Sequence, residues 1–338
     1  MAPFTFFEGL VAASILYFVE RQVDIAVYEV GLGGRLDATR LVNAVLTVIT
    51  GIALDHTEHL GKTREEILQE KLGIVREGIP LVANLPTVKL FRQAERYCRE
   101  YGVEIFDVRG RVKTRLKSMD FHQMIFDLET PDHRYIKLLS KMIGRHQLQN
   151  IATAVRSVEL LSRNKSHTNI DTSKYDAVVK KLDFEVIEKG VRRGLNVAFL
   201  QGRFQVLDGS PRFVLDVSHN ENGLLAALDT FRELSKRENS IIVFGIQANK
   251  DPGRFFKEVH RVARKIIVVP LKTKRSADTG ELVRRFEEGA RSVRIPADIV
   301  ALRGAGEALH SINRICKSGD SILILGSHYL IEEVVRYI

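Results

Sequence analysis

The sequence predicts an α/β protein whose parallel sheets are covered by helices on both faces. In the second half, strand-like and helix-like segments alternate at regular spacing, which is typical of a parallel sheet. In the first half, near-continuous apolar and β-branched runs indicate buried strands. Hydrophobic residues make up 45% of the chain and charged residues 28%, so the chain can form sizeable cores.

The length predicts two domains. A chain of 338 residues divides into two at roughly 150 residues per domain. We place the boundary near residue 196, which gives a first domain over 1–196 and a second over 197–338. The sequence contains neither an internal repeat nor a low-complexity tract.

The first domain is predicted to begin with a helix and to continue through strands and helices into a hairpin region. One helix has a clear start, because Thr63 and Glu66 form the Ser/Thr-x-x-Glu pattern of a capping box. Alternating segments over 111–138 indicate a β-meander or hairpin, and the polar stretch 164–174 is expected to be a surface loop. The other predicted elements are helices at 4–20, 63–76, 87–101, 146–162 and 175–190 and strands at 24–30, 43–50, 79–83 and 103–107.

The second domain is predicted to be a regular strand–helix alternation. The predicted strands are 212–216, 240–245, 265–271, 298–302 and 321–325, and the predicted helices are 221–236, 253–264, 276–289, 306–316 and 329–337. Such sheets bind their ligands beyond the carboxyl ends of the strands. We therefore search for functional residues at those ends.

Composition narrows the class of protein. The net charge of +9 is spread along the chain, and no aromatic-rich basic patch supports nucleic-acid binding. The two cysteines, Cys98 and Cys316, show no pairing pattern, which favours a reducing, cytoplasmic location. The apolar run 9–19 is too short to span a bilayer and lacks the basic start of a signal peptide, so no membrane association is expected.

Two strand ends supply candidate metal ligands. Glu29 lies near the end of the strand predicted at 24–30 and precedes a glycine-rich turn, while His56 follows the next strand. A carboxylate oxygen and an imidazole nitrogen delivered to one sheet edge are a reasonable set for a divalent cation. Taken singly, a glycine-rich strand end is as readily a plain turn, and His56 is more often a hydrogen-bonded loop residue. Lys71, on the helix at 63–76, is by itself a solvated lysine.

Several motifs in a fixed order change this interpretation. They are EVGLGGRLDAT at 29–39, DHTEHLG at 55–61, EKLGI at 70–74, GRHQLQNIATA at 144–154, GRFQ at 202–205, LDVSHN at 215–220, FG at 244–245 with Lys250 and Asp251, and GSHYL at 326–330. Together they resemble folylpolyglutamate synthase/dihydrofolate synthase, a branch of the Mur ligase family. The resemblance covers nearly the whole chain. It implies a P-loop-type Mur ligase central domain, truncated here, followed by a Rossmann-like carboxyl-terminal domain.

The resemblance also implies roles for residues in the first domain. Glu29 and His56 would be Mg²⁺ ligands, and Lys71 would be carbamylated, which turns a cation into an oxygen donor suited to a hard metal. Two segments would contact the pterin substrate. They are Thr5, Phe6, Phe7 and Glu8, and Leu36, Asp37 and Ala38.

The remaining implied roles concern ATP and catalysis. Asn150, Arg203 and Asp216 would contact ATP, and His219 would lie near its phosphates as a catalytic residue beside Lys71. The implied reaction is the ATP-dependent addition of L-glutamate to the carboxylate of folate or dihydropteroate through an acyl phosphate. The implied cofactors are therefore ATP and Mg²⁺.

The chain departs from the family pattern at its most diagnostic motif. No Gly-x-x-x-x-Gly-Lys-Ser/Thr occurs in the 338 residues, although that loop supplies the amides and lysine that hold ATP phosphates. Val217 also stands where the family has glycine, which raises a steric question. We expect either a ligase whose recorded start is too late or a non-catalytic, truncated paralogue that binds nucleotide or a P-loop-bearing partner chain. Without a neighbouring first strand, the segment 24–30 would expose apolar surface and favour a dimer or poor solubility.

Overall fold

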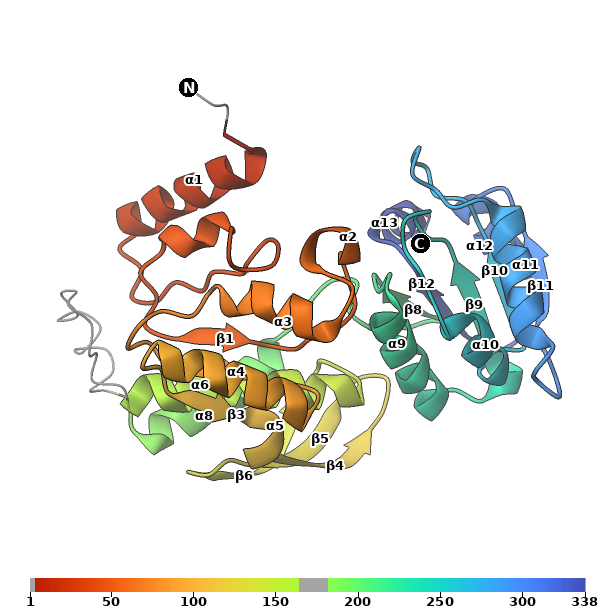
Figure 1. The fold of residues 1–338 in the computed structure, drawn as a ribbon. Coiled ribbons are helices and arrows are strands. Elements are labelled where there is room, and N and C mark those ends of the chain that lie inside the picture. The colour runs from red at the N-terminus through yellow and green to blue at the C-terminus, as the bar shows by residue number, and fades with distance from the viewer. Residues whose placement is uncertain (1–3, 164–181, 338) are drawn as a thin grey trace. The chain divides into compact units, whose positions relative to one another are not determined.

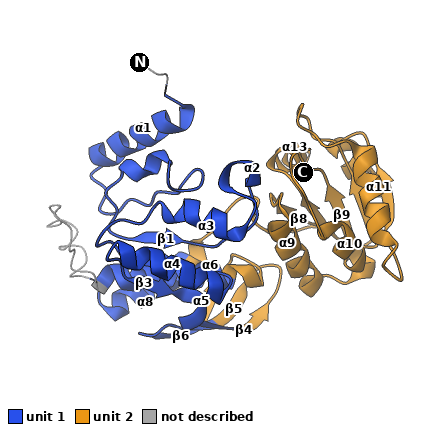
Figure 2. Cartoon of the chain, viewed as in Figure 1, with its two compact units in different colours: residues 1–115, 127–136, 148–194 blue, residues 116–126, 137–147, 195–338 orange. Residues whose placement is uncertain are grey.

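The computed structural model describes residues 4–163 and 182–337 (Figure 1). The chain divides into two compact units, drawn in blue and orange in Figure 2. Unit 1 comprises Met1–Arg115, Asp127–Ile136 and Leu148–Gly194, and unit 2 comprises Leu116–Phe126, Lys137–Gln147 and Leu195–Ile338. The loop predicted at 164–174 and the first part of the helix predicted at 175–190 lie outside the described residues.

A parallel three-stranded sheet forms the centre of unit 1. Its strands are β1 (Thr47–Ile49), β2 (Leu81–Ala83) and β3 (Ile105–Asp107), in the order β1-β2-β3. Helices α3 (Arg64–Leu72) and α4 (Val88–Glu100) pack on this sheet, because their apolar residues share one buried cluster with those of β1 and β2. This arrangement confirms the predicted strand–helix alternation, with strands shorter than expected.

The starts of these helices follow from local sequence. The predicted capping box forms, because the Thr63 hydroxyl accepts a hydrogen bond from the Glu66 amide and the Glu66 side chain accepts one from the Thr63 amide. Helix α4 begins in a similar way, with the Thr87 hydroxyl accepting a bond from Leu90. Each cap satisfies an amide that has no partner within its helix.

The segment 24–30 is not a strand, which corrects the prediction. In the described residues no strand pairs with it, and β1 bonds only to β2. Its apolar side chains are exposed, Ile25 to 48% and Val27 to 89%. The apolar run has the composition of a buried strand, but a strand also needs a neighbour to satisfy its backbone groups. The exposure of apolar surface here was expected.

Helix α1 (Phe6–Glu20) precedes this segment. It confirms the helix predicted at 4–20, and it begins at a capping box formed by Thr5 and Glu8. Val11 is the buried residue of this helix. The large apolar residues that stay exposed are Phe6, Leu10, Leu16, Tyr17 and Val19. Two short helices follow, η1 (Ala38–Leu41) and α2 (Thr57–Leu60).

The hairpin region predicted at 111–138 is confirmed as a three-stranded sheet in the order β4-β5-β6. The strands are β4 (Lys113–Met119), β5 (Met124–Glu129) and β6 (Arg134–Ser140), preceded by the short helix α5 (Val108–Arg111). Helix α6 (Arg145–Arg163) follows, in agreement with the helix predicted at 146–162. The next described helix, α8 (Phe184–Val197), ends seven residues beyond the predicted 190.

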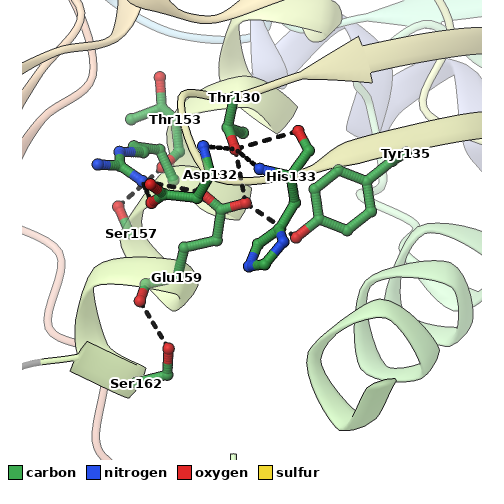
Figure 3. Close-up of polar contacts among 9 residues, drawn as sticks. Thr130, Asp132, His133, Tyr135, Thr153, Ser157, Glu159 and Ser162 are labelled. Atoms are coloured by element: carbon green, nitrogen blue, oxygen red, sulfur yellow. Dashed lines mark hydrogen bonds and ion pairs between the residues drawn. The ribbon is translucent and has the colours of Figure 1, made fainter. Parts of the chain in front are cut away.

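A buried polar cluster ties α6 to the turn between β5 and β6 (Figure 3). The Glu159 carboxylate, 1% exposed, accepts hydrogen bonds from Thr130 Oγ1 at 2.8 Å and from the Tyr135 hydroxyl at 3.0 Å. Arg156 donates to Glu159 at 3.0 Å and also pairs with Asp132. Because each of these groups has a partner, the cluster can be buried without leaving an unpaired charge.

Unit 2 contains a six-stranded sheet in the order β11-β10-β9-β12-β8-β7. Five strands run parallel, as predicted, and β7 pairs antiparallel with β8 at one edge. The sequence analysis did not identify β7, which is three residues long. The strands are β7 (Gln205–Leu207), β8 (Arg212–Asp216), β9 (Ser240–Phe244), β10 (Lys265–Val268), β11 (Asp298–Ala301) and β12 (Ser321–Leu325).

Helices cover both faces of this sheet, as predicted. Side chains alternate along each strand, so Ile242 and Phe244 of β9 join one apolar cluster and Ile241 and Val243 join the other. The first cluster includes residues of α9 (Glu221–Leu234), α10 (Phe255–Glu258) and α11 (Thr279–Ala290), and the second includes residues of α12 (Ala305–Ile315) and α13 (His328–Val335). The helix predicted at 253–264 is shorter, because a turn of 3₁₀ helix, η3 (Val259–Arg261), follows α10.

Among the described residues, no helix has the combination of length and apolar composition needed to cross a bilayer.

Candidate functional site

The glycine-rich loop after residue 30 packs directly on helix α3. A Cβ added to Gly73, just beyond this helix, would lie 2.2 Å from the Arg35 Cα, and one added to Gly34 would lie 2.9 Å from the Lys71 carbonyl oxygen. The Arg35 amide donates to the Glu70 carbonyl at 3.0 Å. Only glycine permits so close an approach of two backbones. The motifs at 29–39 and 70–74 therefore meet in space.

Lys71 lies on the last turn of α3 and is half-buried. Burial lowers the pKa of its amine, and the nearby Asp55 carboxylate partly opposes that change. A lowered pKa leaves more of the amine uncharged near neutral pH, and the uncharged form is the nucleophile. The site thus joins Lys71 with the loop that follows β1.

His56 adopts a backbone conformation that is uncommon for residues other than glycine. Its φ is 50° and its ψ 38°, and it precedes α2 as the N-cap residue. The His56 amide donates to Asp55 Oδ1 at 2.9 Å, and its Nε2 lies 4.0 Å from the same oxygen. Such strained positions concentrate at functional sites, so this conformation motivates a functional role for the exposed His56 ring.

Glu29 is exposed and lies in the segment that is not a strand. The expectation that neighbouring strands would deliver Glu29 and His56 to one sheet edge is therefore wrong for Glu29. No group of three or more His, Cys, Asp or Glu side chains in the described part of the chain could hold a metal ion. One carboxylate and one imidazole still fit Mg²⁺, because Mg²⁺ usually keeps several waters and binds through one or two protein groups plus phosphate.

The two segments implied in substrate contact approach each other. A Cβ added to Gly31 would lie 2.6 Å from the ring of Phe7, so α1 packs against the start of the glycine-rich loop. The Glu8 carboxylate is occupied by the capping box, accepting from the Thr5 amide at 2.6 Å and from its hydroxyl at 3.0 Å. These bonds lower the pKa of Glu8. Phe6 is 87% exposed.

Asp37 organises the loop that contains Leu36 and Ala38. Its carboxylate accepts hydrogen bonds from the Leu32 amide at 3.0 Å and the Thr39 amide at 2.9 Å. Burial raises the pKa of Asp37, but the bonds from Thr39 and Leu32 outweigh burial and lower it overall. The carboxylate is thus committed to fixing the turn before η1.

In unit 2, Asp216 ends strand β8 and fixes the turn that contains Arg203. The buried Asp216 carboxylate accepts from the Phe204 amide at 2.9 Å and from the Ser218 amide at 2.8 Å. Arg203 is exposed beside this turn. His219 is half-buried, and its Nδ1 lies 3.0 Å from the Val217 carbonyl oxygen. The spacing between Arg203 and Asp216 therefore reflects a direct structural connection.

Val217 causes no backbone strain. Its φ is not among the positive values of non-glycine residues in the described chain. A Cβ added to Gly202 would lie 2.6 Å from Val217 Cγ1, so the glycine makes room for the valine side chain. The steric concern raised by this departure from the family pattern therefore does not apply.

His146 is a residue that sequence reasoning passed over. Burial lowers its pKa, while the Asp216 carboxylate raises it and Arg203 lowers it, so the three side chains interact. His146 Nδ1 is buried without a hydrogen-bond partner. Gly144 makes room for the ring, because an added Cβ would lie 2.6 Å from His146 Cε1. The adjacent Gly144 in its motif was the available signal. Asn150, further along α6, is exposed.

Comparison with known proteins identifies the family. The profile of the Mur ligase middle domain matches residues 4–158, and that of the Mur ligase glutamate ligase domain matches residues 202–328. The chain belongs to the Mur ligase family. Its curated relatives place it in the folylpolyglutamate synthase/dihydrofolate synthase branch, and by family it is a ligase.

These Mur ligase relatives match almost the whole chain. The dihydrofolate synthase/folylpolyglutamate synthase of Buchnera aphidicola from Schizaphis graminum is 28% identical, covering 97% of this chain and 70% of the relative. The Escherichia coli protein of the same name is also 28% identical, covering 99% of this chain and 69% of its own length.

Solved structures of Mur ligases of this branch have the same fold. Folylpolyglutamate synthase from Thermotoga maritima superposes with a TM-score of 0.75 at 26% identity, covering 98% of this chain and 70% of the other. E. coli FolC in complex with DHPP and ADP gives a TM-score of 0.80 at 25% identity, covering 99% and 71%.

Proposed function

We propose that this protein is an ATP-dependent amide ligase that adds L-glutamate to the carboxylate of folate or dihydropteroate. The observation that supports this most is the half-buried Lys71, whose lowered pKa accompanies the packing of the EVGLGGRLDAT loop against its helix. That combination goes beyond shared fold, because it brings two motifs of the branch together. Both cysteines are free thiols, which accords with the cytoplasmic location that we propose.

We assign nucleotide binding to Asn150, Arg203 and Asp216. Support comes from the buried Asp216, which fixes the turn bearing Arg203, and from the ADP bound by the E. coli relative. The guanidinium of Arg203 suits phosphate, which it can contact through two parallel bonds. His219, close to Asp216 in the chain, would act near the phosphates.

We assign Mg²⁺ to Glu29 and His56. When bound, the ion would neutralise charge on the transferring phosphoryl group. Lys71 would react as its uncharged amine with CO₂: a nitrogen–carbon bond forms, a proton leaves, and the resulting carbamate is an oxygen donor. The lowered pKa of Lys71 favours this step, because only the uncharged amine has the lone pair.

We assign the pterin-bearing acceptor to the residues 5–8 and 36–38. The contact between Phe7 and Gly31 supports this, since it brings the two segments into one region. The exposed Phe6 ring offers a flat apolar surface for a pterin, whereas Asp37 would act through its effect on the loop.

The reaction would proceed in two displacements. An oxygen of the acceptor carboxylate attacks the γ-phosphorus of ATP, and ADP leaves to give an acyl phosphate. The amine nitrogen of glutamate then attacks the acyl carbon, phosphate leaves and a proton is lost, so an amide forms. Cationic groups such as Arg203 would stabilise charge on the transferring phosphoryl group.

The direct test is ADP release by the purified chain with ATP, Mg²⁺, L-glutamate and either dihydropteroate or tetrahydrofolate. Release that requires both glutamate and acceptor, and that falls at least a hundredfold in Lys71→Ala and Arg203→Ala, is expected. Mass spectrometry of the product should show one added glutamate. No ATP-dependent glutamate addition with any pterin acceptor would refute the ligase assignment.

A second candidate is a non-catalytic protein that binds nucleotide or a partner chain. It is favoured by one observation, the lack of a Gly-x-x-x-x-Gly-Lys-Ser/Thr sequence in these 338 residues. The phosphate-holding groups would then come from a P-loop-bearing partner chain. Calorimetry with ATP, together with the ADP-release assay, separates the two: heat of binding without turnover supports this candidate, and turnover excludes it.

A further inference from the structure

Arg35 forms a two-pronged ion pair with Glu70. Its Nε lies 3.0 Å from Glu70 Oε1 and 3.2 Å from Oε2. The same two residues are joined a second time, because the Arg35 amide donates to the Glu70 carbonyl at 3.0 Å. The side chain of Arg35 is 54% exposed and that of Glu70 26%, so the pair lies at the surface and its strength is limited by solvent.

The pair lies at the point where the glycine-rich loop touches helix α3. Gly73 contacts the Arg35 backbone, and Gly34 contacts the backbone of Lys71. Glu70 immediately precedes Lys71, and Arg35 immediately precedes Leu36. The ion pair therefore connects the neighbour of the candidate carbamylated lysine to the neighbour of the candidate acceptor-binding residues.

Two further arginines hold the other end of the loop. Arg40 Nη1 donates to the Arg35 carbonyl at 3.0 Å, and Arg76, which follows α3, donates through Nη2 to the Arg40 carbonyl at 2.5 Å. The loop is thus fastened at both ends to one helix and its extension. Glycines alone would allow close packing but would leave the loop free to open.

We propose that Arg35 is a positioning residue whose ion pair with Glu70 fastens the loop 31–38 to the helix that bears Lys71. It fixes the distance between the acceptor-binding segment and Lys71 without touching a reactant. The inference rests on the proposed function for the roles of Leu36–Ala38 and Lys71, but the fastening itself can be measured independently of turnover.

The first experiment measures hydrogen exchange of the backbone amides of residues 31–41. Arg35→Ala and Glu70→Ala should each speed exchange by about threefold to fivefold, the factor that an exposed, well-aligned ion pair supplies. Lys89→Ala is the matched control, because it breaks the 2.7 Å pair between Lys89 and Glu65 of the same helix α3 but leaves the loop alone. Unchanged exchange in Arg35→Ala would overturn the proposal.

Charge reversal separates the ion pair from a general loss of stability. The double variant Arg35→Glu/Glu70→Arg should return exchange in 31–41 close to the wild-type rate, whereas Arg35→Glu alone should not. A melt of every variant checks that each is folded. Failure of the reversed pair to restore the rate, in a folded protein, would show that the pair does not fasten the loop.

Turnover then tests the positioning role. Arg35→Ala should raise KM for the pterin acceptor by about threefold to fivefold and leave KM for ATP unchanged, because the proposed ATP contacts lie elsewhere in the chain. An equal rise in both constants would overturn the role in acceptor positioning. If the wild-type chain adds no glutamate at all, the proposed function fails, and the exchange experiments still decide whether Arg35 fastens the loop.

Discussion

At the scale of single residues, His260 shows how burial sets the charge of a side chain. It is fully buried, with Nε2 2.8 Å from the Phe286 carbonyl oxygen and Nδ1 accepting from the Ala297 amide at 3.1 Å. These partners require a neutral ring with its proton on Nε2. Burial lowers the pKa of His260, and the nearby Arg237 lowers it further against the opposing bond to Phe286.

This pKa shift predicts a loss of stability in mild acid. The folded-state pKa lies below the unfolded value of about 6.5, so the contribution of His260 is complete above that pH and is lost as pH falls below it. Urea unfolding at pH 7.5 and 5.5 should show a larger decrease for wild type than for His260→Gln. The variant should also be less stable at pH 7.5 by about 1–3 kcal/mol. Equal pH dependence in both proteins would contradict the assignment.

Gly73 gives a second prediction at the residue scale. An alanine Cβ there would meet the Arg35 backbone at 2.2 Å, and backbone cannot move as a flexible side chain does. We expect Gly73→Ala to lower the free energy of unfolding by about 1–3 kcal/mol and to displace the loop from α3. Gly51→Ala, where nothing lies within 4 Å of an added Cβ, should stay close to wild type in the same denaturation experiment.

At the scale of elements, the cluster around Glu159 explains how the turn between β5 and β6 is held on α6. Thr130 and Tyr135 come from that region of the hairpin, and Arg156 and Glu159 come from the helix (Figure 3). The Phe184 ring stacks on His133 with centroids 4.0 Å apart, which adds α8 to the same region. Burial raises the pKa of the Tyr135 hydroxyl, so it stays protonated and donates to Glu159.

Breaking this cluster should be costly. Glu159→Ala would leave Arg156 and Tyr135 buried without their acceptor, and such losses cost about 3–5 kcal/mol. Chemical denaturation should therefore show a large loss of stability for Glu159→Ala. Glu185→Ala, which removes an exposed pair with Lys189 on α8, is the control and should change stability by at most about 0.5 kcal/mol. Similar losses in the two variants would be inconsistent with the cluster's role.

At the scale of the whole molecule, the apolar residues of α1 and of the segment 24–30 stand out. Phe6, Leu16 and Val19 are exposed to 87%, 71% and 71%, and Val27 to 89%. Contiguous apolar surface of this kind marks an interaction site or a liability for aggregation. The unpaired edge of β1 adds backbone groups that another chain can bond.

We therefore predict self-association of the isolated chain. Sedimentation velocity should show a dimer or larger species at micromolar concentration, and Leu16→Lys/Val19→Lys should shift the population toward monomer. Ile295→Lys, at a 64% exposed apolar residue outside this region, is the control and should leave the distribution unchanged. A monomeric wild type with a single cooperative melt would contradict the prediction.

The sequence by itself determined what depends on neighbours along the chain. The capping box of Thr63 and Glu66 and the five parallel strands of unit 2 formed as predicted, because caps act over three residues and strand–helix alternation is a local pattern. The ordered motifs likewise identified the family without coordinates. The boundary at 196 and the roles of the site residues stay predictions.

Tertiary structure decided what depends on partners far away in the chain. The segment 24–30 has the composition of a strand but no neighbour to pair with, and that lack is not visible in its own residues. The contacts of Gly73 with Arg35 and of His146 with Asp216 join residues 38 and 70 positions apart. Sequence spacing cannot place such pairs, because packing and burial set both their distances and their charge states.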